Sequence, residues 1–194
     1  MRIGLDLDNT IACYDDAFLR LGKEAGLPSE AVLKGKLGIR DYLRSQGRER
    51  EWTIMQGVAY GSRMDEAKPF PGVVEFIHLA GKQGHPVFII SHRTKTPILG
   101  EAYDLHEAAR RWLHKAGVGS SETVFLEETV ESKVDRIRRL ACDLFVDDLP
   151  EFLSRPDMPN HIRKVCFSPK TDRPPPGIEF LNEWNAAHSL LLGI

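Results

Sequence analysis

Two aspartates, Asp6 and Asp8, follow a short apolar run at the start of the chain, and Asn9 and Thr10 come directly after them. On a β-strand, residues i and i+2 point to the same face, so the two carboxylates are expected to converge where the strand ends. Like charges this close raise one another's pKa unless a cation or a proton intervenes. Oxygen ligands of this kind suit a hard divalent cation. The alternative is a strand that ends in a simple turn, in which Asp and Asn bond their own backbone.

Two further apolar runs that suit buried strands also end in polar residues. Residues 87–90 lead into Ser91, and residues 144–146 lead into Asp147 and Asp148. In open α/β sheets, ligands bind at the carboxyl ends of the strands. We therefore expect these side chains to meet the first two aspartates at one edge of a sheet, although each polar group taken alone also suits a turn.

A lysine, Lys133, lies at the start of an expected helix, beside Ser132. A cation in the first turn opposes the helix dipole, so nothing in the local sequence explains its placement. The placement is explained if an anion binds there. The alternative is an ordinary solvated helix lysine, as most lysines are.

Strands and helices alternate after residue 69, which predicts a parallel sheet with right-handed crossovers. Besides the N-terminal run, the apolar pattern predicts strands at 87–90, 123–126, 144–146 and 164–167. It predicts helices at 73–80, 105–116, 134–141 and 180–192. Residues 13–68 show helical patterns and no strand, with a short helix at 29–33, interruptions at Gly35 and Gly38, and a clearer amphipathic helix at 52–59.

The composition is typical of a globular protein. A chain of 194 residues can bury one sizeable core with a small inserted module. The net charge of −2 argues against an extended nucleic-acid interface. The widely spaced Cys13, Cys142 and Cys166 indicate reduced thiols and neither a zinc site nor disulfides. No apolar run approaches membrane-spanning length and acidic residues come early, so we expect a cytoplasmic protein without a membrane partner.

These motifs, in this order, resemble those of the haloacid dehalogenase (HAD) superfamily of phosphohydrolases. The four motifs are Asp6-Leu7-Asp8-Asn9-Thr10, Ser91, Lys133 and Asp147-Asp148. The resemblance implies an α/β fold with a Rossmann-like parallel sheet flanked by helices. It also implies that residues 1–12 and 69–194 form this core domain, and that residues 13–68 form a small helical cap inserted after the first motif.

The resemblance also implies a role for each of these residues. Asp6 is expected to attack phosphorus and form an aspartyl-phosphate, while Asp8 protonates the leaving oxygen and later deprotonates water. Ser91 is expected to donate a hydrogen bond to the phosphoryl group. Lys133 is expected to neutralise the charge of that group.

The expected cofactor is Mg²⁺, held by Asp6, by the backbone carbonyl of Asp8 and by Asp148. Asp147 is then a second direct ligand or lies outside the first coordination shell, and the sequence leaves the order of these two aspartates open.

Four more residues are expected to contact the substrate: Asn9, Thr10, His92 and Arg93. Arginine binds phosphate or carboxylate through two parallel hydrogen bonds, which favours this role for Arg93. Solvent-facing loop positions are the alternative for both His92 and Arg93.

The resulting hypothesis is a Mg²⁺-dependent phosphatase for a small phosphorylated metabolite, such as a nucleoside monophosphate or a sugar phosphate. Dehalogenases of the superfamily lack the second aspartate, so Asp8 favours phosphoryl transfer. A non-catalytic binding or regulatory protein on the same fold is the alternative from another class. A polynucleotide end-phosphatase is less consistent with the slightly acidic charge. The oligomeric state is open.

Overall fold

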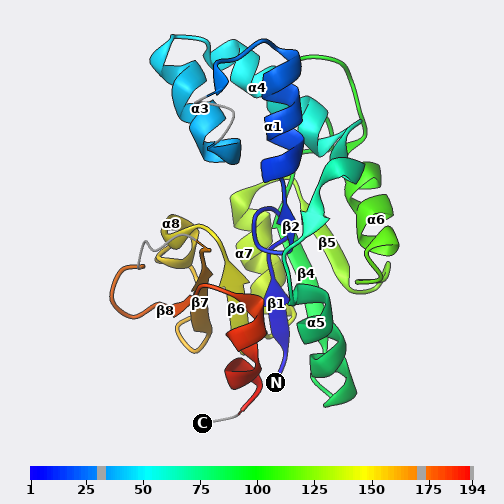
Figure 1. The fold of residues 1–194 in the computed structure, drawn as a ribbon. Helices are drawn as coiled ribbons and strands as arrows, with labels where there is room; N and C mark the ends of the chain where they lie inside the picture. Colours follow the sequence, from blue (N-terminus) through cyan, green and yellow to red (C-terminus); the bar gives the residue numbers. More distant parts are fainter. Residues whose placement is uncertain (30–33, 170–173, 193–194) are drawn as a thin grey trace. The chain divides into compact units, whose positions relative to one another are not determined.

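The structure is a computed structural model that describes residues 1–29, 34–169 and 174–192. The chain divides into two compact units (Figure 1). The first unit consists of Met1–Ala12, Pro69–Arg93 and Leu113–Ile194, and the second consists of Cys13–Lys68 and Thr94–Trp112. We expected a cap of residues 13–68 alone. The second unit also includes the residues that follow the strand at 87–92, and the cap assignment itself stays a prediction.

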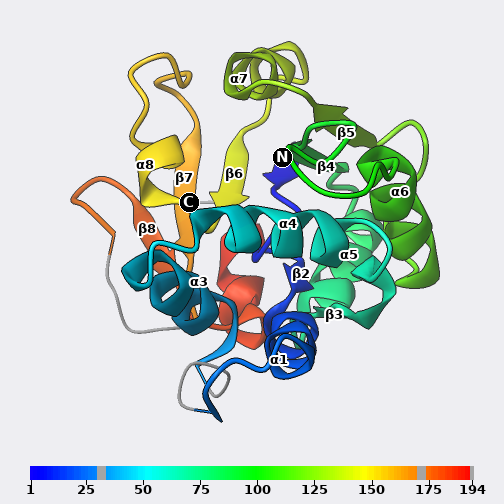
Figure 2. The same ribbon diagram turned by 90° about the horizontal axis from the view of Figure 1, so that it is seen from above.

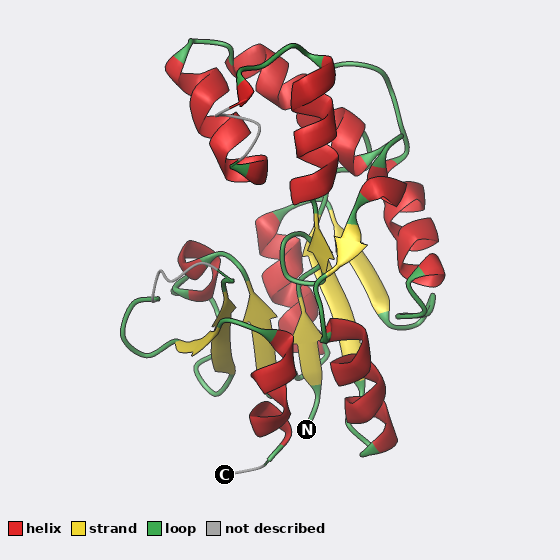
Figure 3. Ribbon diagram, in the orientation of Figure 1, coloured by secondary structure: helices red, strands yellow, loops and turns green. Residues whose placement is uncertain are grey.

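The first unit is built on a six-stranded parallel sheet with the strand order β5-β4-β1-β6-β7-β8 (Figure 3). The strands are β1 (Ile3–Leu5), β4 (Val87–His92), β5 (Val124–Glu127), β6 (Leu144–Asp147), β7 (Arg163–Phe167) and β8 (Glu179–Leu181). The first strand in the sequence therefore lies in the middle of the sheet, between β4 and β6. The predicted α/β class with a Rossmann-like parallel sheet is confirmed.

Helices cover both faces of this sheet (Figure 2). On one face lie α7 (Val130–Arg139) and the short α8 (Pro150–Leu153), which share an apolar cluster with β4 and β6. On the other face lie α5 (Val73–Lys82) and the 3-10 helix η2 (Trp184–Leu191), shown in red. There Trp184 packs against Phe76 and Phe167, with ring centroids 5.1 Å and 5.3 Å apart.

The alternation of side chains along β1 and β6 decides which polar groups face α7. Phe145 belongs to the apolar cluster on the α7 face, so Asp147, two residues later, points to the same face. Gly4 also faces Phe145, because a Cβ atom on Gly4 would come within 2.5 Å of the ring. Asp6, two residues after Gly4, is thereby directed to the α7 face as well.

The second unit is mainly helical. Its elements are α1 (Asp15–Glu24), α3 (Gly35–Ser45), α4 (Glu49–Tyr60) and the 3-10 helix η1 (Met64–Glu66). Phe18 stacks on Trp52 with ring centroids 5.0 Å apart, which joins α1 to α4. The indole nitrogen of Trp112 donates a hydrogen bond of 2.9 Å to the carbonyl of Ala67, which fixes the first part of α6 (Leu105–Lys115) to this unit. The last residues of α6 belong to the first unit.

Some sequence expectations for the second unit differ from the structure. Gly35 and Gly38 do not interrupt a helix, because both lie within α3. Gly35 has a left-handed φ of 67° at the first residue of α3, where the next backbone N–H donates to Asp15. Residues 13–68 also contain strand residues, since β2 (Ala12–Cys13) pairs with β3 (Lys68–Pro69). The expected helix at 29–33 lies largely outside the described residues.

The expected C-terminal helix at 180–192 is only partly correct. Residues 179–181 form β8, whose Phe180 and Leu181 pair with Cys166 and Phe167 of β7, and the helix begins only at Trp184. Pairing with β7 satisfies the backbone groups of this segment and extends the sheet by one strand. Among the helices of the described ranges, none is both long and apolar enough to cross a bilayer.

Candidate active site

The predicted site residues of the first unit gather at the carboxyl ends of β1, β4 and β6. Asp6 directly follows β1, and its backbone N–H donates a hydrogen bond of 2.9 Å to the carbonyl of Val146 in β6. Ser91 lies near the end of β4, and Asp147 is the last residue of β6. Because these three strands are neighbours and parallel, residues distant in sequence share one edge of the sheet.

Lys133 joins two of these aspartates. Its ammonium group lies 2.7 Å from Asp6 Oδ1 and 2.7 Å from Asp147 Oδ2, and its side chain is 4% exposed. The ammonium also lies 4.2 Å from the ring centroid of Phe152, a cation–π distance. We expected an anion beside this lysine to explain its position in the first turn of α7. Within the described chain, the carboxylates of Asp6 and Asp147 lie there.

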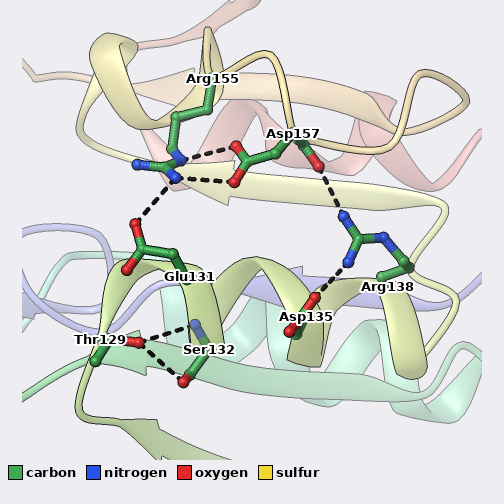
Figure 4. Close-up of polar contacts among 7 residues, drawn as sticks. All are labelled: Thr129, Glu131, Ser132, Asp135, Arg138, Arg155 and Asp157. Atoms are coloured by element: carbon green, nitrogen blue, oxygen red, sulfur yellow. Dashed lines mark hydrogen bonds and ion pairs between the residues drawn. The ribbon is translucent and has the colours of Figure 1, made fainter.

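Helix α7 presents Lys133 to the site because Lys133 lies on the buried side of the helix, together with Val134 and Ile137. Thr129 caps the helix by accepting a hydrogen bond of 3.1 Å from the backbone N–H of Ser132. Figure 4 shows the neighbouring ion pairs, in which Arg155 contacts Glu131 at 3.2 Å and Asp157 at 2.8 Å. Exposed pairs of this kind contribute only about 0–1 kcal/mol each. The buried Val134 and Ile137 therefore contribute more to holding α7 on the sheet.

The burial of Asp6 with Lys133 and Asp147 changes the pKa of Asp6. The pKa of Asp6 is raised to about 7, chiefly by desolvation; Lys133 opposes this rise, while the nearby Asp147 and Asp8 add to it. Burial alone would lower the pKa of Lys133, but Asp147 and Asp6 outweigh that effect and hold the pKa above its usual value. Lys133 is therefore charged at neutral pH, and one cation does not compensate the surrounding carboxylates.

The two aspartates at the end of β6 have different surroundings. Asp147 is fully buried, and both of its oxygens are engaged, because the backbone N–H of Leu149 donates to Oδ1 at 2.9 Å. Asp148 is partly exposed and accepts a hydrogen bond of 3.1 Å from the side chain of Asn9. Asn9 has a φ of 59°, in the left-handed region that asparagine tolerates better than most residues. This geometry favours Asp148 over Asp147 as a direct metal ligand.

Asp8 forms an ion pair with Arg93. The guanidinium of Arg93 donates from Nη2 to Asp8 Oδ1, and the Arg93 side chain is only 2% exposed. The backbone N–H of Arg93 also donates a hydrogen bond of 2.8 Å to the carbonyl of Glu127. Sequence reasoning assigned Arg93 to the substrate and missed this pair, because no spacing pattern relates residues so far apart in the chain.

Two buried hydroxyls in this region have no hydrogen-bond partner among the described residues. They belong to Ser91 and Thr10, which are 1% and 0% exposed. Leaving a buried hydroxyl unsatisfied costs about 1–3 kcal/mol, so Ser91 at a strand end is well suited to donate to a ligand. The backbone carbonyl of Thr10 accepts a hydrogen bond of 3.0 Å from the indole of Trp184, which holds the loop after β1. His92, by contrast, is exposed.

The donor chemistry of the site fits a divalent cation. Four aspartates lie at this edge of the sheet, where Lys133 contacts Asp6 and Asp147, and Arg93 contacts Asp8. Within the described ranges, no group of three His, Cys, Asp or Glu side chains is arranged to hold a metal ion. The predicted ligand set does not need one, because it combines two carboxylates with the backbone carbonyl of Asp8. All of these are the oxygen donors that Mg²⁺ prefers.

The cysteines take no part in this site. None of the three forms a disulfide within the described part of the chain, and burial raises the pKa of Cys142 to about 12 and that of Cys166 to about 11. A thiol with so high a pKa is neutral at physiological pH and is a weak nucleophile.

Comparison with known proteins gives a consistent picture of the fold. No family model matches the chain, and no curated protein matches it. A HAD-superfamily hydrolase of subfamily IA, variant 1, from Geobacter sulfurreducens superposes with a TM-score of 0.58 at 12% identity, covering 98% of this chain and 95% of that one. A protein described as a dehalogenase gives a TM-score of 0.57 at 15% identity, covering 100% and 97%.

A third similar structure is a HAD phosphatase from Thermococcus onnurineus, with a TM-score of 0.53 at 15% identity, covering 99% of this chain and 98% of that one. Identities this low establish the fold alone. The expectation based on the four sequence motifs is confirmed at that level: this chain has the α/β fold of the HAD-superfamily hydrolases.

Proposed function

We propose that the chain is a Mg²⁺-dependent phosphohydrolase that removes phosphate from a small phosphorylated metabolite through an aspartyl-phosphate. The observation that carries this proposal is the buried contact of Lys133 with Asp6 and Asp147 at the edge of the sheet where β4 ends in Ser91, whose hydroxyl has no hydrogen-bond partner among the described residues. A nucleophilic carboxylate, a buried cation and a free hydrogen-bond donor are the groups that phosphoryl transfer requires.

In the first step, an oxygen of Asp6 forms a bond to phosphorus as the bond from phosphorus to the leaving oxygen breaks. Asp8 gives a proton to the leaving oxygen, and the alcohol departs. Asp8 then accepts a proton from water as the water oxygen attacks phosphorus, which releases inorganic phosphate and restores the Asp6 carboxylate. Lys133 and Ser91 contact the phosphoryl oxygens throughout.

Bound Mg²⁺ would supply charge neutralisation between Asp6 and the phosphoryl oxygens. The residues proposed to hold it are Asp6, Asp148 and the backbone carbonyl of Asp8. The engagement of both Asp147 oxygens supports a role for Asp147 outside the first coordination shell. Contacts of Asn9, Thr10 and His92 with the substrate remain part of the proposal, whereas the guanidinium of Arg93 contacts Asp8.

The shared fold does not choose between phosphate transfer and dehalogenation, since proteins described by both names have it. A halide leaves as an anion and needs no proton, whereas an alkoxide needs one. The presence of a second aspartate, Asp8, two residues after Asp6 supports the reaction that uses a proton donor. We further propose that residues 13–68 serve as the cap that selects the substrate, with a nucleoside monophosphate or a sugar phosphate as candidate substrates.

The test is phosphate release from a panel of nucleotides and sugar phosphates, with Mg²⁺ and with EDTA. Wild type, Asp6→Asn and a control, Asp41→Asn at an exposed position of α3, are assayed in parallel. We expect phosphate release that requires both Mg²⁺ and Asp6. The control variant should keep this activity. Release by Asp6→Asn at the wild-type rate would contradict the nucleophile assignment. Mg²⁺ binding without release from any substrate would favour the regulatory alternative.

A further inference from the structure

Arg93 is almost completely buried in its ion pair with Asp8. The Arg93 side chain is 2% exposed, while the Asp8 side chain is 21% exposed. A buried guanidinium needs a charged or strongly polar partner, because transfer of a lone charge out of water is costly. The contact with Asp8 supplies such a partner and directs one Arg93 N–H toward the carboxylate.

Backbone pairing holds both partners of this ion pair. Arg93 follows the last residue of β4, and its N–H donates to the carbonyl of Glu127 in β5 at 2.8 Å. Asp8 lies in the loop after β1, where an isolated bridge to Ala12 is the nearest regular pairing. The planar guanidinium therefore acts as a fixed reference to which the Asp8 side chain is held.

The position of Asp8 is under opposing electrostatic influences. Asp6 lies two residues away on the same strand end, and each carboxylate repels the other. Without a cation, this repulsion would favour side-chain rotamers that turn Asp8 away from Asp6. The ion pair with Arg93 counteracts it and holds the carboxylate at the edge of the sheet where Asp6 and Ser91 lie.

We propose that Arg93 is a positioning residue, whose buried guanidinium holds the Asp8 carboxylate in place for proton transfer to the leaving group. The inference rests on the proposed phosphohydrolase function and gives Arg93 a role different from binding the substrate phosphate. The role acts through Asp8, so loss of Arg93 impairs the proton-transfer step and leaves substrate affinity unchanged.

The test compares leaving groups. An alkyl phosphate needs protonation of its leaving oxygen, whereas p-nitrophenyl phosphate releases a stable phenolate with little help. We expect Arg93→Met to slow single-turnover release of the alcohol from an alkyl phosphate by about 10- to 100-fold, as part of the 10²- to 10⁴-fold that a general acid supplies. The loss with p-nitrophenyl phosphate should be under about threefold, and KM should stay within about threefold for both substrates.

Three further variants complete the experiment. Asp8→Asn should show the same dependence on the leaving group, and the double variant should be no slower than Asp8→Asn alone, because both changes remove one function. Arg93→Lys keeps the charge without the planar fork and should recover part of the rate. Arg50→Met, an exposed position on α4, is the matched control and should behave as wild type. Should Arg93→Met fail to fold, Arg93→Lys provides the same comparison of leaving groups.

The outcomes separate this inference from the proposed function. Equal losses for both leaving groups, or a loss confined to KM, would show that Arg93 binds the substrate and would overturn the positioning role, while the phosphatase assignment stands. Absence of release by the wild type from every substrate would overturn the proposed function and the positioning role together.

Discussion

Replacement of Lys133 by methionine removes the cation that lies between two buried carboxylates. Its ammonium is 2.7 Å from an oxygen of Asp6 and 2.7 Å from an oxygen of Asp147. With an effective dielectric constant of about 20, two unit charges at that distance attract by about 6 kcal/mol, much of which offsets the cost of burying them. Removal of one partner alone leaves the other charges uncompensated, so we expect Lys133→Met to lower the free energy of unfolding by about 3–5 kcal/mol at pH 8.

The loss should depend on pH. In the variant, Asp6 can take up a proton in the folded state, which relieves the uncompensated charge. Asp6 has a pKa of about 7 in the wild type, and without Lys133 its pKa should rise further. Each unit of that rise up to pH 8 is worth about 1.4 kcal/mol, so the loss of unfolding free energy at pH 5 should be smaller than at pH 8 by up to about that amount. Lys133 itself contributes stability at both pH values, because its raised pKa keeps it charged and its contribution is lost only above the pKa of an unfolded lysine.

The assay is urea denaturation at pH 5 and pH 8, in EDTA so that metal ions do not contribute. Lys82→Met, at an exposed position at the end of α5, controls for the loss of a lysine. Asp6→Asn in the Lys133→Met background should recover part of the stability, since it removes one of the stranded charges. A loss below about 1 kcal/mol at pH 8, or an equal loss at both pH values, would refute the account of the buried group.

Three other predictions test the remaining geometry. Asp148→Asn should weaken Mg²⁺ binding, measured by calorimetry, at least about tenfold more than Asp147→Asn does, and the reverse order would exchange their roles. Gly4→Ala should lower the unfolding free energy by about 1–3 kcal/mol, because its Cβ would meet the Phe145 ring at 2.5 Å; an unchanged denaturation midpoint would contradict this packing. The folded state holds the Asp6 proton up to about pH 7, whereas the unfolded chain releases it near pH 3.8, so in EDTA the stability of wild type should fall across that range. Asp6→Asn should remove this slope, and a slope that persists would show that another group causes it.

The central part of the fold could be predicted because its signals are local. Apolar runs such as 87–90 and 144–146 are short, continuous and bounded by polar residues, which is typical of strands buried on both faces. β8 could not be recognised in the same way. Its residues Glu179–Leu181 contain one buried side chain, and the segment becomes a strand because β7 offers an unpaired edge. Propensity alone does not contain that tertiary information.

The candidate site could likewise be predicted only in part. The carboxylates could be located because parallel strands bring their carboxyl ends together. The side chains that contact these carboxylates could not be predicted. The contact of Asp8 with Arg93 and that of Asp148 with Asn9 depend on side-chain directions that the folded sheet sets. Lys133 was recognised as a charge that needed an anion, but no sequence pattern indicated that Asp6 and Asp147 would supply it.

The central place of β1 in the sheet has a consequence for the synthesis of the chain. Its residue Leu5 pairs with Ile89 on one side and with Val146 on the other, so its second neighbour emerges from the ribosome about 140 residues later. At about 5–20 residues per second, β1 waits for roughly 7 to 30 seconds with an edge unpaired. A strand of three residues exposes few backbone groups during that wait. The shortness of β1 therefore limits misassembly of the nascent chain before Asp6 and the buried Lys133 can meet.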